Sequence, residues 1–566
     1  MQPVSTSPAD FLKIFFGRRI FWAPYFWGPY LFFGAILLVR PERSFRWPVR
    51  NRQTGGMRTA GAVGGVVAAA VALAVAEAAA VVTGPQSSPL TAVGDVVVDH
   101  APEPMVRFGI TVFGTYDKVA LLIGTVLLLA GSAAGLGAAA VRRLWIGLAG
   151  LAAFGAVGLA AAVSRPDADW GAVLPTLAGA TAAALTYTRI RSRVVMDSPA
   201  GLSSPAGPSA PGVLTDRRRF LRVAALTVGA AAVAGMGARW WSLRQNVAAA
   251  REAVTLPVPV DPAGPVPAGA DLRLPGLASY VTDNDDFYRI DTALVPPRVD
   301  PSEWRLRIHG RVARPYEITF EELLARPMVE RYITLACVSN QVGGDLIGNA
   351  RWLGVPVRDL IEAAGPLPGA DQVVSRSVDG WTCGTPTQVL TDGRDALLAV
   401  GMNGEPLPLE HGFPVRMVVP GLYGYVSACK WISELELSSF DDFDAYWVPR
   451  GWAPQAPIKT QSRIDTPRGR ARAGTVMVAG VAWAQHRGVA RVEVRVDGGP
   501  WQEATLAEAV SVDTWRQWSW RWEATPGEHE LVVRATDATG EVQPEERSAA
   551  APDGATGWHT VRVEVS

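Results

Sequence analysis

Cys337 is the residue of this chain whose type and position best suit a soft metal. It follows an apolar, strand-like run, Tyr332–Ala336, and precedes a glycine-punctuated stretch, Gly343–Pro356. Thiolate sulfur is a ligand that soft transition metals prefer. A lone cysteine after a strand is more often a small core residue, so the metal interpretation depends on the motifs that accompany it.

A second group of polar residues lies further along the chain. It comprises the motifs Met402–Pro408, His411–Arg416, Val418–Gly421, Tyr423–Tyr425 and Ser427–Trp431. Arginine and lysine give charge-assisted hydrogen bonds to phosphate, and arginine can give them in pairs. Arg416 and Lys430, each taken alone, would be surface cations, so any anion-binding role for them depends on the order of the accompanying motifs.

In this order the motifs resemble the molybdenum-pterin domain of the sulfite oxidase family, over roughly residues 280–566. The resemblance implies an oxidoreductase that transfers an oxygen atom, with a molybdenum-molybdopterin cofactor (Mo-MPT) and Cys337 as the protein ligand to the metal. Tungsten fits the same pattern. The catalytic residues that it implies are Cys337, Arg289 and Arg450. The residues that it implies for cofactor binding are Arg289, Asp291, Asn340, Asp379, His411, Arg416, Ser427 and Lys430.

Two positions depart from the sulfite oxidase pattern. Val342 stands where sulfite oxidases have an arginine, five residues after the metal cysteine. Pro449 aligns with their tyrosine, although Tyr446 is near. Arg289 and Arg450 remain to hold an anion, so the small oxo substrate and the reaction direction, sulfite oxidation or sulfoxide reduction, both stay open.

The elements around these motifs predict an α+β domain. Trp304–Ile308 alternates apolar and charged residues, as a half-buried strand does. Thr319 is placed to cap a short helix, and Gly365 is placed to end a helix over Val355–Ala364.

The last hundred residues predict an immunoglobulin-like β-sandwich. A hairpin turn at Asp497–Gly499 follows the clearest strand. The expected strands are Gly474–Trp483, Val492–Val496, Trp518–Trp522, Glu530–Ala535 and His559–Val565. By resemblance this is a dimerisation domain and the protein a homodimer; a substrate-binding module is the alternative.

The first 245 residues predict an all-α transmembrane bundle. A span needs about 20 apolar residues. The candidates are Ala60–Val82, Lys118–Val141, Leu144–Val163, Trp170–Thr188 and Phe220–Trp241, with Ile20–Val39 weaker. Arginine-rich loops alternate with acidic loops, and the rule that positive loops are cytoplasmic places the catalytic half outside the cell membrane.

Arg217–Arg222 resembles a twin-arginine export signal placed before the last span, although plain topology anchors look similar. Ser198–Gly212 is expected to be a flexible loop. The expected domains are 1–245 (membrane), 246–275 (a Pro-rich linker, with Leu256–Pro275 as tether), 276–465 (molybdopterin binding) and 466–566 (immunoglobulin-like).

Composition limits the possible partners. The 53 basic and 53 acidic residues balance, so nucleic acid is not an expected partner. Only His100 precedes residue 300 among six histidines, so a bis-histidine haem in the bundle is excluded. The sequence has no Cys-x-x-Cys-His haem motif and no cytochrome b5-like domain, so we expect electrons to pass to or from a separate electron-transfer protein or quinone-linked partner. The alternative from another class is a non-catalytic membrane receptor. A transporter is disfavoured because Glu77 is the main acid within the spans.

Overall fold

The computed structural model describes residues 52–566 except 103–104, 106–107, 110–111, 114–116, 167, 197–211 and 245–246. The predictions for Ile20–Val39 and for the loop that begins at Ser198 lie outside the described residues. The side chains of the twin-arginine stretch lie outside them as well, although its backbone forms part of a helix.

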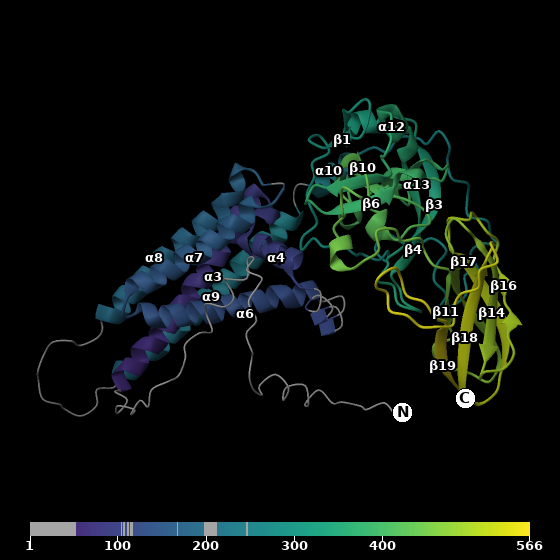
Figure 1. Ribbon diagram of the computed structural model, residues 1–566. Helices are drawn as coiled ribbons and strands as arrows, with labels where there is room; N and C mark the ends of the chain where they lie inside the picture. Colours follow the sequence, from purple (N-terminus) through teal and green to yellow (C-terminus); the bar gives the residue numbers. More distant parts are fainter. Residues whose placement is uncertain are drawn as a thin grey trace, which may run out of the picture. The chain divides into compact units, whose positions relative to one another are not determined.

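The N-terminal part is helical (Figure 1). Its helices are α3 (Arg52–Thr83), α4 (Pro89–His100), α6 (Asp117–Ala140), α7 (Leu144–Val163), α8 (Leu174–Met196), α9 (Gly212–Arg244) and α10 (Val247–Ala253), with 3-10 turns η1 (Pro85–Ser87) and η3 (Trp170–Val173). Segments long and apolar enough to cross a membrane are Met57–Thr83, Lys118–Ala140 and Leu144–Val163. They match three of the predicted spans.

The other two predicted spans are also helices, but their apolar segments are shorter or less apolar than a membrane span requires. Within the described residues, α8 is not apolar enough to count as a membrane span, because its second half contains the polar residues Thr186 and Thr188 and the charged residues Arg189 and Arg191. In α9 the apolar segment of the described residues is the shorter Arg222–Ala238.

Helices α3 and α6 approach closely through small residues. A Cβ atom on Gly65 would lie 2.0 Å from the carbonyl oxygen of Ala133, and one on Gly137 would lie 2.3 Å from that of Gly61. Tyr187 of α8 donates a hydrogen bond to the carbonyl oxygen of Gly137 (2.8 Å). Such contacts are typical of helices that pack in lipid, where small residues bring backbones together.

Two sheets form the domain that carries Cys337, and the α+β prediction is confirmed (Figure 1). The first has the order β2-β1-β10-β5-β6, and the second has the order β3-β4-β7-β8 with β9 beside β7. The strands are β1 (Arg305–Gly310), β2 (Tyr316–Thr319), β3 (Val329–Ala336), β4 (Ile347–Pro356), β5 (Gln372–Ser377), β6 (Thr382–Pro386), β7 (Leu397–Met402), β8 (Glu405–Pro406), β9 (Arg416–Val418) and β10 (Ile432–Ser438).

Short helices and turns join these strands. They are α11 (Phe320–Leu324), α12 (Val357–Ala364), α13 (Thr387–Thr391), η4 (Leu409–His411), η5 (Gly424–Val426) and η6 (Val448–Arg450). Thr319 caps α11 in a capping box with Glu322, an arrangement that contributes about 1 kcal/mol. Gly365 ends α12 at a φ of 69°, as its position after the apolar run predicted.

The C-terminal part is a β-sandwich whose two sheets share one apolar core, including Trp518, Val492 and Leu531. The sheets have the orders β11-β13-β17-β16 and β12-β19-β18-β14-β15. The strands are β11 (Gln461–Thr466), β12 (Gly469–Ala471), β13 (Gly474–Trp483), β14 (Val489–Val496), β15 (Gln502–Glu503), β16 (Thr505–Leu506), β17 (Arg516–Ala524), β18 (Gly527–Asp537) and β19 (His559–Val565). Because β11 pairs with β13, the sandwich begins a few residues before the predicted boundary at 466.

The Pro-rich run that the sequence suggested as a tether lies against the folded domains. The amide of Val260 donates to the carbonyl of Met328 (2.8 Å), and the amide of Leu272 donates to Oε1 of Gln517 (2.7 Å). Ala270 is fully buried. The run is therefore part of the packed structure.

Candidate active site

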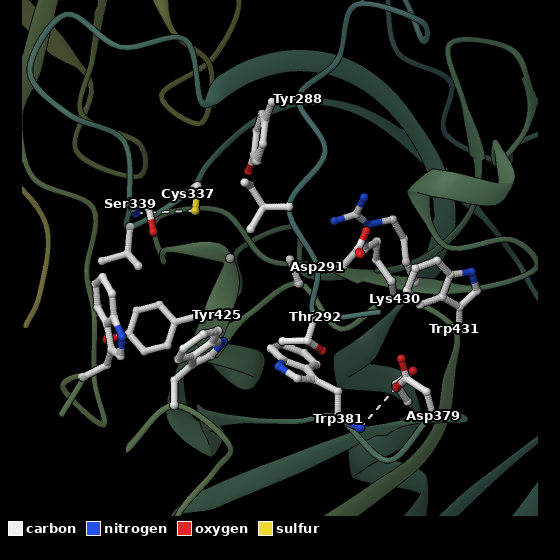
Figure 2. Close-up of a pocket in the computed structure, with 18 of the residues that line it drawn as sticks. Tyr288, Asp291, Thr292, Cys337, Ser339, Asp379, Trp381, Tyr425, Lys430 and Trp431 are labelled. Atoms are coloured by element: carbon white, nitrogen blue, oxygen red, sulfur yellow. Dashed lines mark hydrogen bonds and ion pairs between the residues drawn. The ribbon is translucent and has the colours of Figure 1, made fainter. Parts of the chain in front are cut away.

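A cavity of about 210 Å³ collects most of the predicted site residues from segments far apart in the sequence (Figure 2). Of the predicted residues, its walls contain Asp291, Cys337, Asp379, His411, Arg416, Lys430 and Arg450. The cavity lies where the loops after β3, β5 and β9 meet the segment 287–292. The sequence alone gave no distance between these loops, and their convergence supports one shared site.

Cys337 enters this cavity directly after β3. Its amide donates to the carbonyl of Leu346 (2.9 Å), which extends the β3–β4 pairing by one residue and fixes the backbone at the thiol. Burial raises the pKa of the Cys337 thiol, and the amide of Ser339 approaches its Sγ atom at 3.4 Å (Figure 2). A buried thiol of this kind becomes a thiolate when a bound metal replaces its proton.

Gly412 allows the three residues His411, Arg416 and Lys430 to converge. Its φ is 107°, a conformation that favours glycine, and a Cβ atom there would lie 3.0 Å from Cβ of Arg416 and 3.1 Å from Cβ of Lys430. Only glycine fits between them without a shift of the neighbours. The motif His411–Arg416 thus combines functional side chains with the one residue that lets them meet.

Arg416 is a buried cation with unused hydrogen-bonding capacity. It is 5% exposed, and its guanidinium donates to the carbonyl of His411 (3.1 Å) and lies 5.1 Å from the centre of the Trp352 ring. Within the described residues its Nε atom has no hydrogen-bond partner. Burial lowers the pKa of Arg416 to about 10. A buried guanidinium with a free donor suits an anionic or carbonyl-bearing ligand.

Lys430 and Asp291 form the closest of the ion pairs around Asp291 in the cavity wall. Nζ of Lys430 lies 2.6 Å from Oδ2 of Asp291, which also pairs with Arg289 (2.9 Å) and Lys118 (2.7 Å). Burial opposes the charge on Asp291, but the three cations, Lys430 foremost, hold its pKa well below the usual range. Burial lowers the pKa of Lys430 to about 8, although Asp291 favours its charged form.

His411 is neutral at physiological pH. Burial, with Arg416 next in importance, lowers its pKa to about 4. Its Nε2 atom lies 3.1 Å from the carbonyl oxygen of Asn284, so this nitrogen carries the proton and donates it. The neutral ring packs edge-on against Phe287, with ring centres 5.5 Å apart.

Arg450 and Asp379 lie elsewhere on the cavity wall. The guanidinium of Arg450 stacks on the ring of Tyr446 at 3.7 Å and donates to the carbonyl of Asp99 (2.6 Å). Asp379 accepts the amide hydrogen of Trp381 at 3.2 Å (Figure 2). Arg450 is thus a cation whose donors are partly engaged by backbone carbonyls.

Three predicted cofactor residues do not line the cavity. Arg289 is partly exposed and pairs with Asp291. Asn340 is buried and its Oδ1 atom accepts from the amide of Leu346 (3.0 Å), which closes the loop after Cys337. Ser427 is fully buried and donates to the carbonyl of Tyr423 (2.9 Å). Arg289 thus reaches the cavity only through its ion pair with Asp291, whereas the side chains of Asn340 and Ser427 bind the backbone of neighbouring loop residues.

Sequence reasoning missed the aromatic wall of the cavity. This wall contains Tyr288, Trp381, Tyr425, Trp447 and Trp452. Tyr425 and Trp452 have ring centres 5.7 Å apart, and Trp447 and Trp452 have ring centres 6.2 Å apart. The only signal in the sequence was position: each of these residues lies within three positions of a predicted site residue, but aromatic residues are equally common in cores.

The residue types fit a cofactor that brings most of its own metal ligands. Among the described residues, no group of three or more His, Cys, Asp or Glu could hold a metal ion alone. One thiol faces the same cavity as two buried cations, one of which has a free donor. This set suits an anionic sulfur-bearing cofactor whose metal takes one further thiolate from the protein.

Two family models match the chain. The oxidoreductase molybdopterin binding domain matches residues 293–447, and the Mo-co oxidoreductase dimerisation domain matches residues 456–566. Both matches fall on the two C-terminal domains, so the helical part lies outside them. The second match supports the inferred homodimer.

Curated relatives agree with these matches. Sulfite oxidase of Gallus gallus is 33% identical over 318 residues, 47% of this chain and 68% of the relative. Mitochondrial sulfite oxidase of Rattus norvegicus is 30% identical over 345 residues, 51% of this chain and 62% of the relative, so the chain spans about two thirds of these proteins. The uncharacterized oxidoreductase YuiH of Bacillus subtilis is 34% identical over 166 residues, 29% of this chain and 80% of the relative.

Among solved structures, the sulfane dehydrogenase SoxCD from Paracoccus pantotrophus is similar at 25% identity and a TM-score of 0.44, and the match covers 50% of this chain and 82% of that chain. The molybdopterin-binding family model covers Cys337, His411, Arg416 and Lys430, and this match together with the chicken sulfite oxidase implies a molybdenum-molybdopterin cofactor. The chain belongs to the sulfite oxidase family of molybdopterin-dependent oxidoreductases.

Proposed function

We propose that this protein transfers an oxygen atom to or from a small oxo compound at molybdenum, with Cys337 as the ligand from the protein. The observation that carries the proposal is the joint position of one buried thiol and two buried cations, Arg416 and Lys430, on the walls of one cavity. A decayed site, as in a non-catalytic receptor, would be expected to have lost some of these residues.

The cofactor, when bound, would supply the metal that exchanges the oxygen atom with the substrate, giving up two electrons when it gains the oxygen and taking up two when it donates it. Arg416 and Lys430 bind its anionic part, and the free Nε donor of Arg416 gains a partner there. His411, neutral and with its proton donated from Nε2 to the carbonyl of Asn284, can offer the cofactor only Nδ1 as a hydrogen-bond acceptor, and it adds no positive charge.

Tyr288 is the residue best placed to serve the oxygen atom. Its hydroxyl group points into the cavity on the side of Cys337 (Figure 2). Burial raises the pKa of Tyr288 and the neighbouring Cys337 raises it further, so the hydroxyl keeps its proton at physiological pH. It can donate a hydrogen bond to an oxygen atom that gains negative charge.

We infer that an organic sulfoxide fits this cavity better than sulfite. The wall of Trp447, Trp452 and Tyr425 favours an apolar substituent, whereas Arg450 already donates to backbone carbonyls. Neither Val342 nor Pro449, the two positions that depart from the sulfite oxidase pattern, lines the cavity. In this reaction the sulfoxide takes up two protons and two electrons and yields a thioether and water, and a separate electron-transfer partner supplies the electrons.

We propose that the catalytic domains lie at the outer face of the cell membrane. The support is the alternation of arginine-rich and acidic loops together with three helices apolar enough to span a bilayer. The same proposal includes export by a twin-arginine signal at Arg217–Arg222, an immunoglobulin-like form of the sandwich and homodimerisation.

Activity profiling of the purified protein tests the function. The full chain is produced in a host that makes the pterin cofactor and is assayed with sulfite and an artificial electron acceptor, and with aryl and alkyl sulfoxides and an artificial donor. We expect turnover of sulfoxides that exceeds turnover of sulfite and is absent in Cys337→Ser. Cys383→Ala, which changes a buried thiol outside the cavity, serves as the control. A metal-loaded protein without activity in any of these assays would contradict the proposal.

A further inference from the structure

The loop that follows Cys337 is held from outside its own domain. It runs from Val338 to Leu346, between β3 and β4. Arg463 of β11, in the C-terminal sandwich, donates a hydrogen bond from its Nη1 atom to the carbonyl oxygen of Gly344 (2.8 Å). This carbonyl lies near the end of the loop, two residues before Leu346, whose own carbonyl binds the amide of Cys337.

The side chain of Arg463 is itself fixed. It is 8% exposed, and it makes two contacts with Asp465: Nε donates to Oδ1 (2.6 Å) and Nη2 donates to Oδ2 (3.3 Å). Asp465 in turn accepts the amide hydrogen of Ala278 (3.2 Å). A guanidinium held at two of its nitrogens presents the third in one direction, so the contact with Gly344 has a defined geometry.

His559 of β19 supports the same loop at the neighbouring residue. A Cβ atom on Gly343, whose φ is 77°, would lie 2.2 Å from Nε2 of His559, so the imidazole packs directly on this glycine. Nδ1 of His559 lies 3.0 Å from the amide nitrogen of Ile464, which makes Nδ1 an acceptor and the ring a neutral tautomer with its proton on Nε2. The ring is therefore fixed by β11, the strand that also carries Arg463.

The strand on the other side of Cys337 is held from the sandwich as well. The amide of Trp515 donates to Oγ1 of Thr334 (2.8 Å), and Nε2 of Gln485 donates to the carbonyl of the same residue (3.2 Å). Thr334 lies in β3, three residues before Cys337. The sandwich thus contacts the chain on both sides of the thiol.

We propose that Arg463 and His559 are positioning residues that set where the Cys337 sulfur lies relative to the metal. They act through the loop and touch neither cofactor nor substrate. The outer contacts of a metal ligand commonly change metal affinity or activity by roughly ten- to hundredfold when they are removed. The inference goes beyond the proposed function and rests on its assignment of Cys337 as the metal ligand.

The position of the loop should affect how readily the Cys337 thiol reacts with an alkylating reagent, even in protein without cofactor. Cys383 and Cys429 are fully buried, whereas Cys337 is 8% exposed and faces the cavity. The full chain is therefore produced in a host that cannot make the pterin, and the rate of alkylation at Cys337 is measured by mass spectrometry. We expect Arg463→Met to change this rate by roughly tenfold or more, and Arg463→Lys to restore part of it. Arg470→Met is the matched control, because Arg470 lies in the same sandwich, pairs with Glu564 and is 86% exposed.

The loaded protein provides a spectroscopic readout. We expect Arg463→Met to shift the electron paramagnetic resonance spectrum of the half-reduced metal and to lower kcat with little change in KM. Without Arg463, the buried carboxylate of Asp465 keeps, among the described residues, only its longer ion pair with Arg468 (3.5 Å). Should the single variant fail to fold for that reason, the double variant Arg463→Met/Asp465→Asn removes the poorly compensated charge. Gly343→Ala supplies an independent test: its added methyl group meets the His559 ring, and the second change His559→Ala should restore part of the wild-type spectrum.

An unchanged alkylation rate and an unchanged spectrum in a folded, metal-loaded Arg463 variant would overturn the inference. Retention of molybdenum by Cys337→Ser would instead overturn the assignment of Cys337, so the two failures are distinguishable.

Discussion

The ammonium group of Lys430 lies 2.6 Å from the carboxylate of Asp291, so this cation of the cavity carries its own counterion. Asp291 also pairs with Arg289 (2.9 Å), and this ion pair connects Arg289, which does not line the cavity, to the candidate site. The pair keeps Lys430 charged in a place where burial alone would favour the neutral amine. The positive charge of Lys430 in the candidate cofactor site thus depends on the negative charge of Asp291.

The first prediction concerns pH. Lys430 is charged below its pKa of about 8 and neutral above it, so its attraction for an anionic cofactor is present below pH 8 and is lost as the pH rises through this value. In Asp291→Asn the carboxylate no longer favours the charged amine, and we expect the loss to occur at lower pH. The measurement is pterin released on dialysis between pH 6 and pH 10. Asp285→Asn, an exposed acid of the same segment, is the control. Equal release by both variants at every pH would argue against a role for the pair.

The second prediction concerns Arg416. Because it is buried and no carboxylate pairs with it among the described residues, Arg416→Met should leave the unfolding temperature of the cofactor-free protein unchanged or higher. The same variant should lose roughly tenfold or more of its bound cofactor, since the guanidinium is a main partner of the anion. Thermal unfolding of the apoprotein and molybdenum analysis of the loaded protein measure the two effects. A variant that is destabilised yet fully loaded would mean that Arg416 serves the fold instead.

The third prediction concerns Tyr288. Tyr288→Phe removes the hydroxyl that points into the cavity and should lower kcat by roughly a hundredfold, with a small change in KM. Steady-state kinetics on protein matched for molybdenum content measures it. Tyr446→Phe is the matched control, because the hydroxyl of Tyr446 binds Asp99 and does not line the cavity. Equal kinetics of the two variants would remove Tyr288 from the mechanism.

The fourth prediction concerns the aromatic wall. Trp452→Leu should lower kcat/KM for an aryl sulfoxide by roughly tenfold relative to dimethyl sulfoxide, because the indole contacts the apolar substituent. Trp501→Leu, in the sandwich and away from the cavity, should change neither value. The competing outcome, an equal loss for both substrates, would indicate that Trp452 only shapes the cavity.

The sequence allowed much of the fold, and seven of the residues that line the cavity, to be predicted for identifiable reasons. The strand from Gly474 to Trp483, the cap at Thr319 and the end of α12 at Gly365 follow from local periodicity and turn chemistry, which one segment contains in full. The residues Cys337, His411, Arg416 and Lys430 followed from ordered motifs.

What escaped prediction depends on contacts between distant segments. The aromatic wall joins Trp381 to Trp452, and no periodicity marks residues that meet only after folding. The Pro-rich run looked like a free tether because its contacts with Met328 and Gln517 lie far along the chain. The support of the Cys337 loop by Arg463 belongs to the same class, since β11 follows the loop by more than a hundred residues.

Molybdenum content of the purified protein tests the central claim most directly. The wild-type chain, produced in a pterin-competent host, should contain molybdenum in stoichiometric amount, and Cys337→Ser should lose it while Cys383→Ala keeps it. A folded wild-type protein without molybdenum or tungsten, or a Cys337→Ser variant with a full complement, would contradict the account.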